Sequence, residues 1–246
     1  MPAARICSFL LVLTCGAIAA AQSEPAREFY ARTNSYGFLV GYSNDSSRML
    51  AGDSAQRKLV LIGGSYSRKL ILRRWLNWQY DGEVLPVALD SDPVATSVIT
   101  QTYTNPPRTV TTVNEGPTEF ACIPASTTTT VGGITLTAVT TCSRRWVYGG
   151  GMSPIGFRWN FLPRRQLQPF LVGHGGFIQS VDAIPISDAG SFNFTYDAGA
   201  GFEWYRKRMQ SVRFEARFHH ISNKETAPRN PGIDAVLFVA SYVFGR

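Results

Sequence analysis

The chain has 246 residues, of which 44% are hydrophobic and 17% are charged, and its formal net charge at pH 7 is +7. That length suits one all-β domain, and the absence of an apolar run of about 18 residues beyond the N-terminal segment excludes a membrane protein built from helices. The basic charge fits an anionic partner such as a phosphorylated membrane surface, although a solvated basic face explains the charge equally well.

Residues 1–21 have the pattern of a secretory signal peptide. Arg5 supplies a positive start, residues 6–18 are apolar, and three alanines form a small-residue cleavage site. The apolar run is short for a membrane anchor, and the threonine before Cys15 is a poor match for a lipoprotein site. Cleavage removes Arg5, lowers the net charge from +7 to +6, and leaves a single domain over residues 22–246.

Three β-strands are predicted early in the mature chain, over residues 35–44, 58–67 and 70–80. Successive side chains of a strand point to opposite faces, and residues 35–44 place large apolar side chains on one face and mostly small ones on the other. The second segment alternates less cleanly, and its Gly63 and Gly64 permit a bend. The third gives a mixed pattern.

Residues 85–144 interrupt this pattern. The segment is rich in Thr, Pro and Ser, and only residues 134–139 resemble a strand. We interpret it as a long inserted loop or hairpin, since the flanks are too incomplete for it to link two domains. Cys122 and Cys142 remain after export, so an oxidising compartment predicts a disulfide bond between them. The insertion either shields a functional site or decorates a loop.

Five further strands are predicted over residues 148–161, 167–181, 191–205, 211–222 and 234–244. With the first three they make eight strands, the smallest even number that closes a membrane barrel. Tryptophans gather near strand ends, as the girdles of such a barrel require. The predicted fold class is therefore all-β: an eight-stranded antiparallel transmembrane β-barrel of the outer-membrane type.

The strand at residues 211–222 shows the two faces most clearly. One row of side chains is apolar and includes Phe214, whereas the other is charged and includes Arg213, Glu215 and Arg217. An apolar face turned to lipid and a charged face turned to a polar lumen explain both rows. In a soluble sandwich the charged row would need buried partners along its whole length.

The residue types of a catalytic triad converge where the last two strands would pair. His220 and Ser222 end one apolar row, and Asp234 begins the next. Histidine takes a serine proton near neutral pH, and a carboxylate fixes the imidazole tautomer. An antiparallel hairpin would bring these residues together, so the pattern predicts an esterase that works through an acyl-enzyme. The candidate oxyanion donors are Asn223, Asn230 and the Gly232 amide.

The other histidines fit structural roles: His219 points to the lumen as the partner of a carboxylate, and His174 lies among glycines. The sequence contains no metal-ligand cluster and no phosphate-cradling loop, so we expect no metal, nucleotide or other cofactor and no nucleic-acid partner. In an even-stranded barrel the longer loops are extracellular. The candidate site would then face the outer leaflet, whose main lipid is lipopolysaccharide.

Two short motifs resemble the lipid A 3-O-deacylase family of outer-membrane enzymes. They are the runs His220-Ile221-Ser222-Asn223 and Asn230-Pro231-Gly232-Ile233-Asp234. The resemblance implies a barrel that removes an ester-linked 3-hydroxyacyl chain from lipid A, with His220 as base, Ser222 as nucleophile and Asn230 as oxyanion donor. Two features depart from the family: Asp234 stands where its best-known members carry Glu, and the 85–144 insertion has no counterpart.

A non-catalytic outer-membrane barrel with a structural or adhesion role is the rival interpretation. A small lumenal channel is a third, although eight strands leave little room for a pore. The partners expected for the enzyme are the outer membrane and its lipid A or lipopolysaccharide, and the sequence leaves open whether the chain forms a homodimer.

Overall fold

The computed structural model describes residues 29–246, so the predicted signal peptide at residues 1–21 lies outside the described part. Among residues 29–246 there is no helix with the length and apolar character of a membrane span. The ten strands are β1 (Asn34–Ser43), β2 (Lys58–Leu72), β3 (Leu76–Thr104), β4 (Pro107–Pro117), β5 (Ala125–Val131), β6 (Ile134–Phe161), β7 (Leu167–Ser180), β8 (Phe192–Lys207), β9 (Gln210–Ser222) and β10 (Ile233–Gly245).

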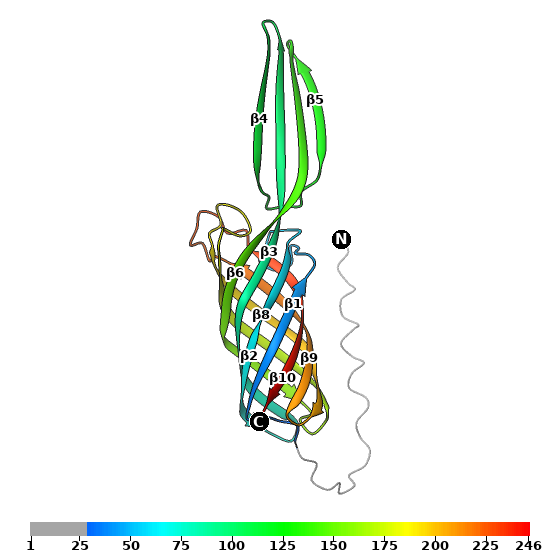
Figure 1. Cartoon of the computed structure of the whole chain (residues 1–246), viewed down its shortest axis with the longest axis vertical. Coiled ribbons are helices and arrows are strands. Elements are labelled where there is room, and N and C mark those ends of the chain that lie inside the picture. Colours follow the sequence, from blue (N-terminus) through cyan, green and yellow to red (C-terminus); the bar gives the residue numbers. More distant parts are fainter. Residues whose placement is uncertain (1–28) are drawn as a thin grey trace, which may run out of the picture.

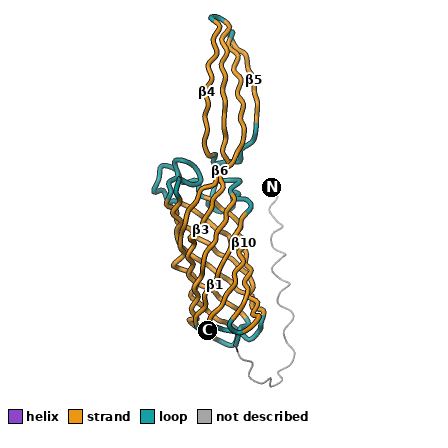
Figure 2. Tube along the Cα trace, in the orientation of Figure 1, coloured by secondary structure: helices purple, strands orange, loops and turns teal. Residues whose placement is uncertain are grey.

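Eight of the strands close into a ring (Figure 1 and Figure 2). The strand order is β4-β3-β2-β1-β10-β9-β8-β7-β6-β5, and an additional pairing between β3 and β6 joins the two arms. Each pair in the ring is antiparallel. The predicted eight-stranded antiparallel arrangement is confirmed, and β4 and β5 are two more strands outside the ring.

The two sides of the ring wall differ in polarity. On the outer side, Phe238 of β10 is 64% exposed. On the inner side, Arg213 and Arg217 of β9 are 1% and 2% exposed, and Arg217 pairs with Glu83 at 2.7 Å. The alternation predicted for residues 211–222 is therefore confirmed, and the inward charges are partners of one another, as burial requires.

The predicted boundary between the second and third strands is wrong. We predicted a strand over residues 70–80, but β2 continues to Leu72 and β3 begins at Leu76. The backbone N–H of Arg73 donates to the Leu76 carbonyl at 2.7 Å and closes a tight turn. The turn was missed because the segment contains neither Gly nor Pro, which most often mark turns.

The inserted segment is a projecting sheet rather than a loop. β3 and β6 run beyond the ring and pair with β4 and β5 in the order β4-β3-β6-β5 (Figure 1). We call this sheet, residues 94–143, the extension. Its outer strands are exposed on both faces, so they carry no apolar row that marks a strand in the sequence. These outer strands are instead rich in threonine, a residue that favours β-strands. The predicted strand at residues 134–139 is only a fragment of β6.

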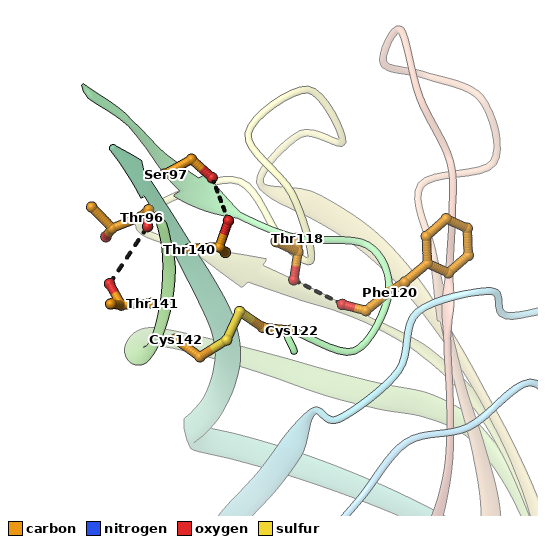
Figure 3. The surroundings of a disulfide bond; sticks show 8 residues. All are labelled: Thr96, Ser97, Thr118, Phe120, Cys122, Thr140, Thr141 and Cys142. Atoms are coloured by element: carbon orange, nitrogen blue, oxygen red, sulfur yellow. Dashed lines mark hydrogen bonds between the residues drawn. A yellow bond between two sulfur atoms is a disulfide. The ribbon is translucent and has the colours of Figure 1, made fainter. Parts of the chain in front are cut away.

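The disulfide bond predicted between Cys122 and Cys142 is present at the base of the extension (Figure 3). It joins β6 to residues 118–124, the connection between β4 and β5, with 5.8 Å between the two Cα atoms. Within that connection, Thr118 Oγ1 donates to the Phe120 carbonyl at 2.8 Å. We call residues 118–124 the disulfide segment.

The long connections gather at the end of the ring from which the extension rises. β1, β3, β7 and β9 all run toward this end, so connections 44–57, 181–191 and 223–232 lie there together. The connections at the opposite end are short, and the C-terminus lies at that end (Figure 1). One rim of the ring therefore holds most of the irregular structure.

Candidate active site at the rim

His220 and Asp234 contact each other across the last hairpin. The register of β9 and β10 sets Asp234 directly opposite His220, and His220 Nδ1 lies 2.6 Å from Asp234 Oδ1. The Asp234 side chain is 0% exposed, whereas the His220 side chain retains 19% exposure. The carboxylate is thus buried behind an imidazole that remains accessible, which is the arrangement a general base needs.

The other oxygen of Asp234 is held by connection 44–57. Oδ2 accepts hydrogen bonds from the backbone N–H groups of Leu50 at 2.7 Å and Ala51 at 2.9 Å. Gly52 packs so closely that a Cβ there would lie 2.6 Å from Asp234 N. These three residues could not be predicted from the sequence, because backbone donors leave no side-chain pattern. The glycine in a turn-rich connection was the one signal available.

Ser222 lies two residues along β9 from His220, on the same face of the strand. Its hydroxyl donates to Asn230 Oδ1 at 3.0 Å and accepts from the Lys224 backbone N–H at 3.2 Å. Asn230 Oδ1 also accepts from the Asn223 backbone N–H at 3.1 Å. A mechanism in which His220 takes the Ser222 proton would require the hydroxyl to rotate away from Asn230, a rearrangement common in enzymes without substrate.

Asn223 joins connection 181–191 to connection 223–232. Its side-chain nitrogen donates to the carbonyls of Ala189 and, at 2.7 Å, Arg229, and its side-chain oxygen accepts from the Glu225 backbone N–H at 2.8 Å. Both amide hydrogens are thus engaged with backbone carbonyls, which leaves this residue poorly placed to donate to an oxyanion.

Gly232 lies beside the imidazole. It adopts a φ of 59°, in the left-handed region that favours glycine, and a Cβ there would lie 3.3 Å from His220 Cε1. Of the three oxyanion candidates, Asn230 accepts a hydrogen bond from Ser222 through its amide oxygen, and Gly232 lies beside the His220 ring.

An apolar groove of about 590 Å³ opens beside the site on the outer wall. Tyr196 and Phe194 of β8 line it, and the register sets them opposite His220 and Ser222 respectively. Two further grooves of about 460 Å³ contain none of the site residues. A slot of this size and polarity can seat an acyl chain next to the serine. The other residues of the groove are Pro154, Ile155, Gly175, Gly176, Phe177, Thr195 and Lys224.

The remaining histidines lie in the lumen. His174 Nδ1 lies 2.8 Å from Asp197 Oδ1, and His219 Nδ1 lies 3.7 Å from Asp197 Oδ2. Both histidines are buried beside a carboxylate, which fits the structural roles predicted for them. Within residues 29–246, no group of His, Cys, Asp and Glu side chains is arranged to hold a metal ion.

Comparison with known proteins points to one family. The family model of lipid A 3-O-deacylase (PagL) matches residues 187–243, the part of the chain that holds His220, Ser222, Asn230 and Asp234. No curated protein sequence matches the chain.

Two solved structures align with most of the chain at low identity. The crystal structure of the outer membrane enzyme PagL is 12% identical, with a TM-score of 0.46, over 86% of this chain and 99% of its own. LpxR from Salmonella typhimurium is 7% identical, with a TM-score of 0.25, over 86% of this chain and 100% of its own. The match to the family model carries the comparison, and over residues 187–243 it confirms the predicted resemblance of this chain to the lipid A 3-O-deacylase family.

Proposed function

We propose that this protein is an outer-membrane serine esterase that removes an ester-linked 3-hydroxyacyl chain from lipid A. The observation that carries the proposal is the 2.6 Å contact between His220 and Asp234, at a groove that Ser222 also lines. The family match over the same residues supports the substrate class.

The polarity of the ring supports a place in the membrane. A barrel pairs its backbone groups internally, and it presents an apolar outer face and a polar lumen. Trp75, Trp146 and Trp204 are exposed, as aromatic residues at a membrane interface are. Outer-membrane barrels have short periplasmic turns and longer extracellular loops, so the rim that holds the site faces the outer leaflet.

The proposed reaction is ester hydrolysis in two steps. Asp234 holds Nδ1 of His220, so Nε2 acts as the base. Ser222 turns its hydroxyl to Nε2, loses its proton and attacks the ester carbonyl, and the histidinium then protonates the departing sugar oxygen. A water molecule deprotonated by His220 attacks the acyl-enzyme, releases the hydroxy fatty acid and restores the serine.

The carbonyl oxygen becomes negative in both steps and needs hydrogen-bond donors. We assign this role to the Gly232 N–H beside the imidazole and to the Asn230 side-chain NH2. The amide oxygen of Asn230 now accepts from the Ser222 hydroxyl, so the amide turns to present its N–H groups once the serine leaves it. The acyl chain would lie in the groove toward Phe194 and Tyr196, whose rings border the serine and the histidine.

The test counts lipid A acyl chains by mass spectrometry in outer membranes that contain the protein or a variant. Wild-type protein should remove one hydroxyacyl chain, and Ser222→Ala and His220→Ala should each abolish that loss. Ser126→Ala changes an exposed serine of the extension and serves as the matched control. Activity that survives both site substitutions would contradict the proposed mechanism.

A structural or adhesion role is the second candidate function. The extension favours it, because its outer strands are exposed on both faces and project well beyond the rim (Figure 1). Fully acylated lipid A in membranes that contain folded wild-type protein would support this role over the esterase.

A further inference from the structure

Arg57 joins four segments at the rim that carries the site. Its side chain is 0% exposed and pairs with Asp92 of β3 at 3.2 Å. Burial lowers the pKa of the Arg57 guanidinium, and the Asp92 carboxylate opposes that change. The side chain also donates to four backbone carbonyls, those of Ala55 at 2.5 Å, Thr118, Glu119 at 2.7 Å and Pro185 at 3.2 Å. The guanidinium is thus committed to holding backbone segments together.

Arg57 is linked to Asp234 through connection 44–57. The Ser46 hydroxyl accepts from the Arg57 backbone N–H at 3.0 Å and donates to the Ser54 carbonyl at 2.9 Å. These bonds fold connection 44–57 around Arg57. The same connection supplies the two backbone N–H groups that bind the Asp234 carboxylate.

A second link from Arg57 leads toward the nucleophile. Pro185, whose carbonyl accepts from Arg57, lies in connection 181–191 with Ala189. The Ala189 carbonyl accepts from the side chain of Asn223, the residue that directly follows Ser222. Arg57 therefore belongs to the connection that binds the acid, and it donates to a second connection that binds Asn223, the neighbour of the nucleophile.

The disulfide segment closes the arrangement. It presents two carbonyls to Arg57, and one of them, that of Glu119, also accepts from the Ala55 N–H at 3.1 Å. The Glu119 carboxylate pairs with Arg229 of connection 223–232, the connection that carries Asn230 and Gly232. The segment that Cys122 belongs to is thus in contact with both sides of the site.

We propose that Arg57 and the disulfide segment form a clasp that positions Asp234, His220 and Ser222, and that the Cys122–Cys142 bond keeps this clasp closed. The inference rests on the proposed function and gives the insertion a part in it. A displacement of about 1 Å between reacting groups costs about 100-fold in rate, so contacts that support the reacting residues control kcat.

The first test opens the disulfide bond in the full-length folded protein. The Cys122→Ser/Cys142→Ser variant, and wild-type protein reduced with dithiothreitol, should release hydroxyacyl chains from lipid A with a kcat about 10- to 100-fold lower and nearly unchanged KM. Reoxidation of the reduced protein should restore kcat. A heat-modifiable gel shift checks that the ring, which lies outside the bond, stays folded.

The second test replaces Arg57, whose planar guanidinium donates several hydrogen bonds in fixed directions. Arg57→Lys keeps the charge but cannot serve several carbonyls in fixed geometry, so it should also lower kcat with little change in KM. Arg108→Lys is the matched control, because Arg108 lies over the Tyr103 ring of the extension at 4.7 Å and touches no part of the clasp. Should Arg57→Lys fail to fold, the double serine variant decides.

A third measurement does not depend on activity. Hydrogen–deuterium exchange over residues 46–54 should be faster in the double serine variant, because Leu50 and Ala51 lose a fixed acceptor. The clasp would be overturned if the double serine variant had the same kcat and the same exchange rate as the wild-type protein. A wild-type protein that releases no hydroxyacyl chain would instead overturn the proposed function, and the exchange result alone would then decide the clasp.

Discussion

At the scale of single residues, the contact between Asp234 and His220 depends on strand register. Aspartate is one methylene shorter than the glutamate of the family's best-known members, and it still reaches the imidazole because the two Cα positions are directly paired. Its second oxygen is bound by Leu50 and Ala51. The carboxylate is therefore oriented from two sides, as a residue that fixes a histidine tautomer has to be.

Asp234→Asn should lower kcat by about 10²- to 10⁴-fold, because an amide does not stabilise the imidazolium and favours the wrong tautomer. The ring should still form, since the substitution keeps the side-chain volume. Release of hydroxy fatty acid from lipid A measures the rate. Asp182→Asn, which changes an exposed aspartate of connection 181–191, should leave it unchanged. An unaltered rate in Asp234→Asn would remove Asp234 from the mechanism.

Gly52→Ala should lower activity although Gly52 is outside the predicted triad. A Cβ at this position would lie 2.6 Å from Asp234 N, so connection 44–57 must shift and carry its two donors away from the carboxylate. Gly116→Ala in the extension is the matched control, because nothing lies within 4 Å of a Cβ there. Equal kcat values for the two variants would show that the donors do not position Asp234.

The sequence pointed to the side chains of the proposed reaction but not to the groups that hold them. His220, Ser222 and Asp234 are visible because strand alternation puts them at matching ends of two apolar rows. Their supports are backbone N–H groups and carbonyls from distant connections, which any residue can supply. Arg57 illustrates this limit, since nothing in its local sequence distinguishes it from an exposed arginine.

At the scale of elements, the groove across β6, β7 and β8 should set the acyl chain preference. Gly175 lines the groove, and a Cβ there would meet nothing within 4 Å. Gly175→Leu should fill that space and reduce the rate for long acyl chains more than for short ones. Gly173→Leu, on the same strand outside the groove, is the control, and rates on ester substrates of graded length are the measurement. An unchanged preference for acyl chain length would mean that the acyl chain binds outside this groove.

The extension shows why one element escaped prediction. Strands in the ring alternate because one face is apolar and exposed and the other faces a charged lumen. β4 and β5 face solvent on both sides, so neither face selects apolar residues. Threonine-rich composition is shared by loops and exposed strands, and pairing partners such as Thr100 and Thr137 are far apart in the sequence.

At the scale of the whole molecule, the ring depends on charges neutralised inside its lumen. Arg217 pairs with Glu83 at 2.7 Å and with Glu215 at 2.9 Å, and all three are buried. Arg217→Met should therefore destabilise the folded protein by about 3–5 kcal/mol, because it removes the cation that two buried carboxylates share. Urea unfolding followed by gel mobility measures the change.

The matched control for that substitution is Arg48→Met. Arg48 pairs with Asp53 at 2.7 Å on the surface, where both side chains are exposed, and such pairs contribute about 1 kcal/mol or less. Equal losses of stability in the two variants would mean that the lumenal charges are solvated rather than dependent on one another.

A mass spectrum of lipid A after incubation with the purified, detergent-solubilised protein is the decisive test of the proposed activity. We predict a loss of mass equal to one 3-hydroxyacyl chain, an equal amount of free 3-hydroxy fatty acid, and neither product with Ser222→Ala. Lipid A of unchanged mass in the presence of folded wild-type protein would contradict this prediction.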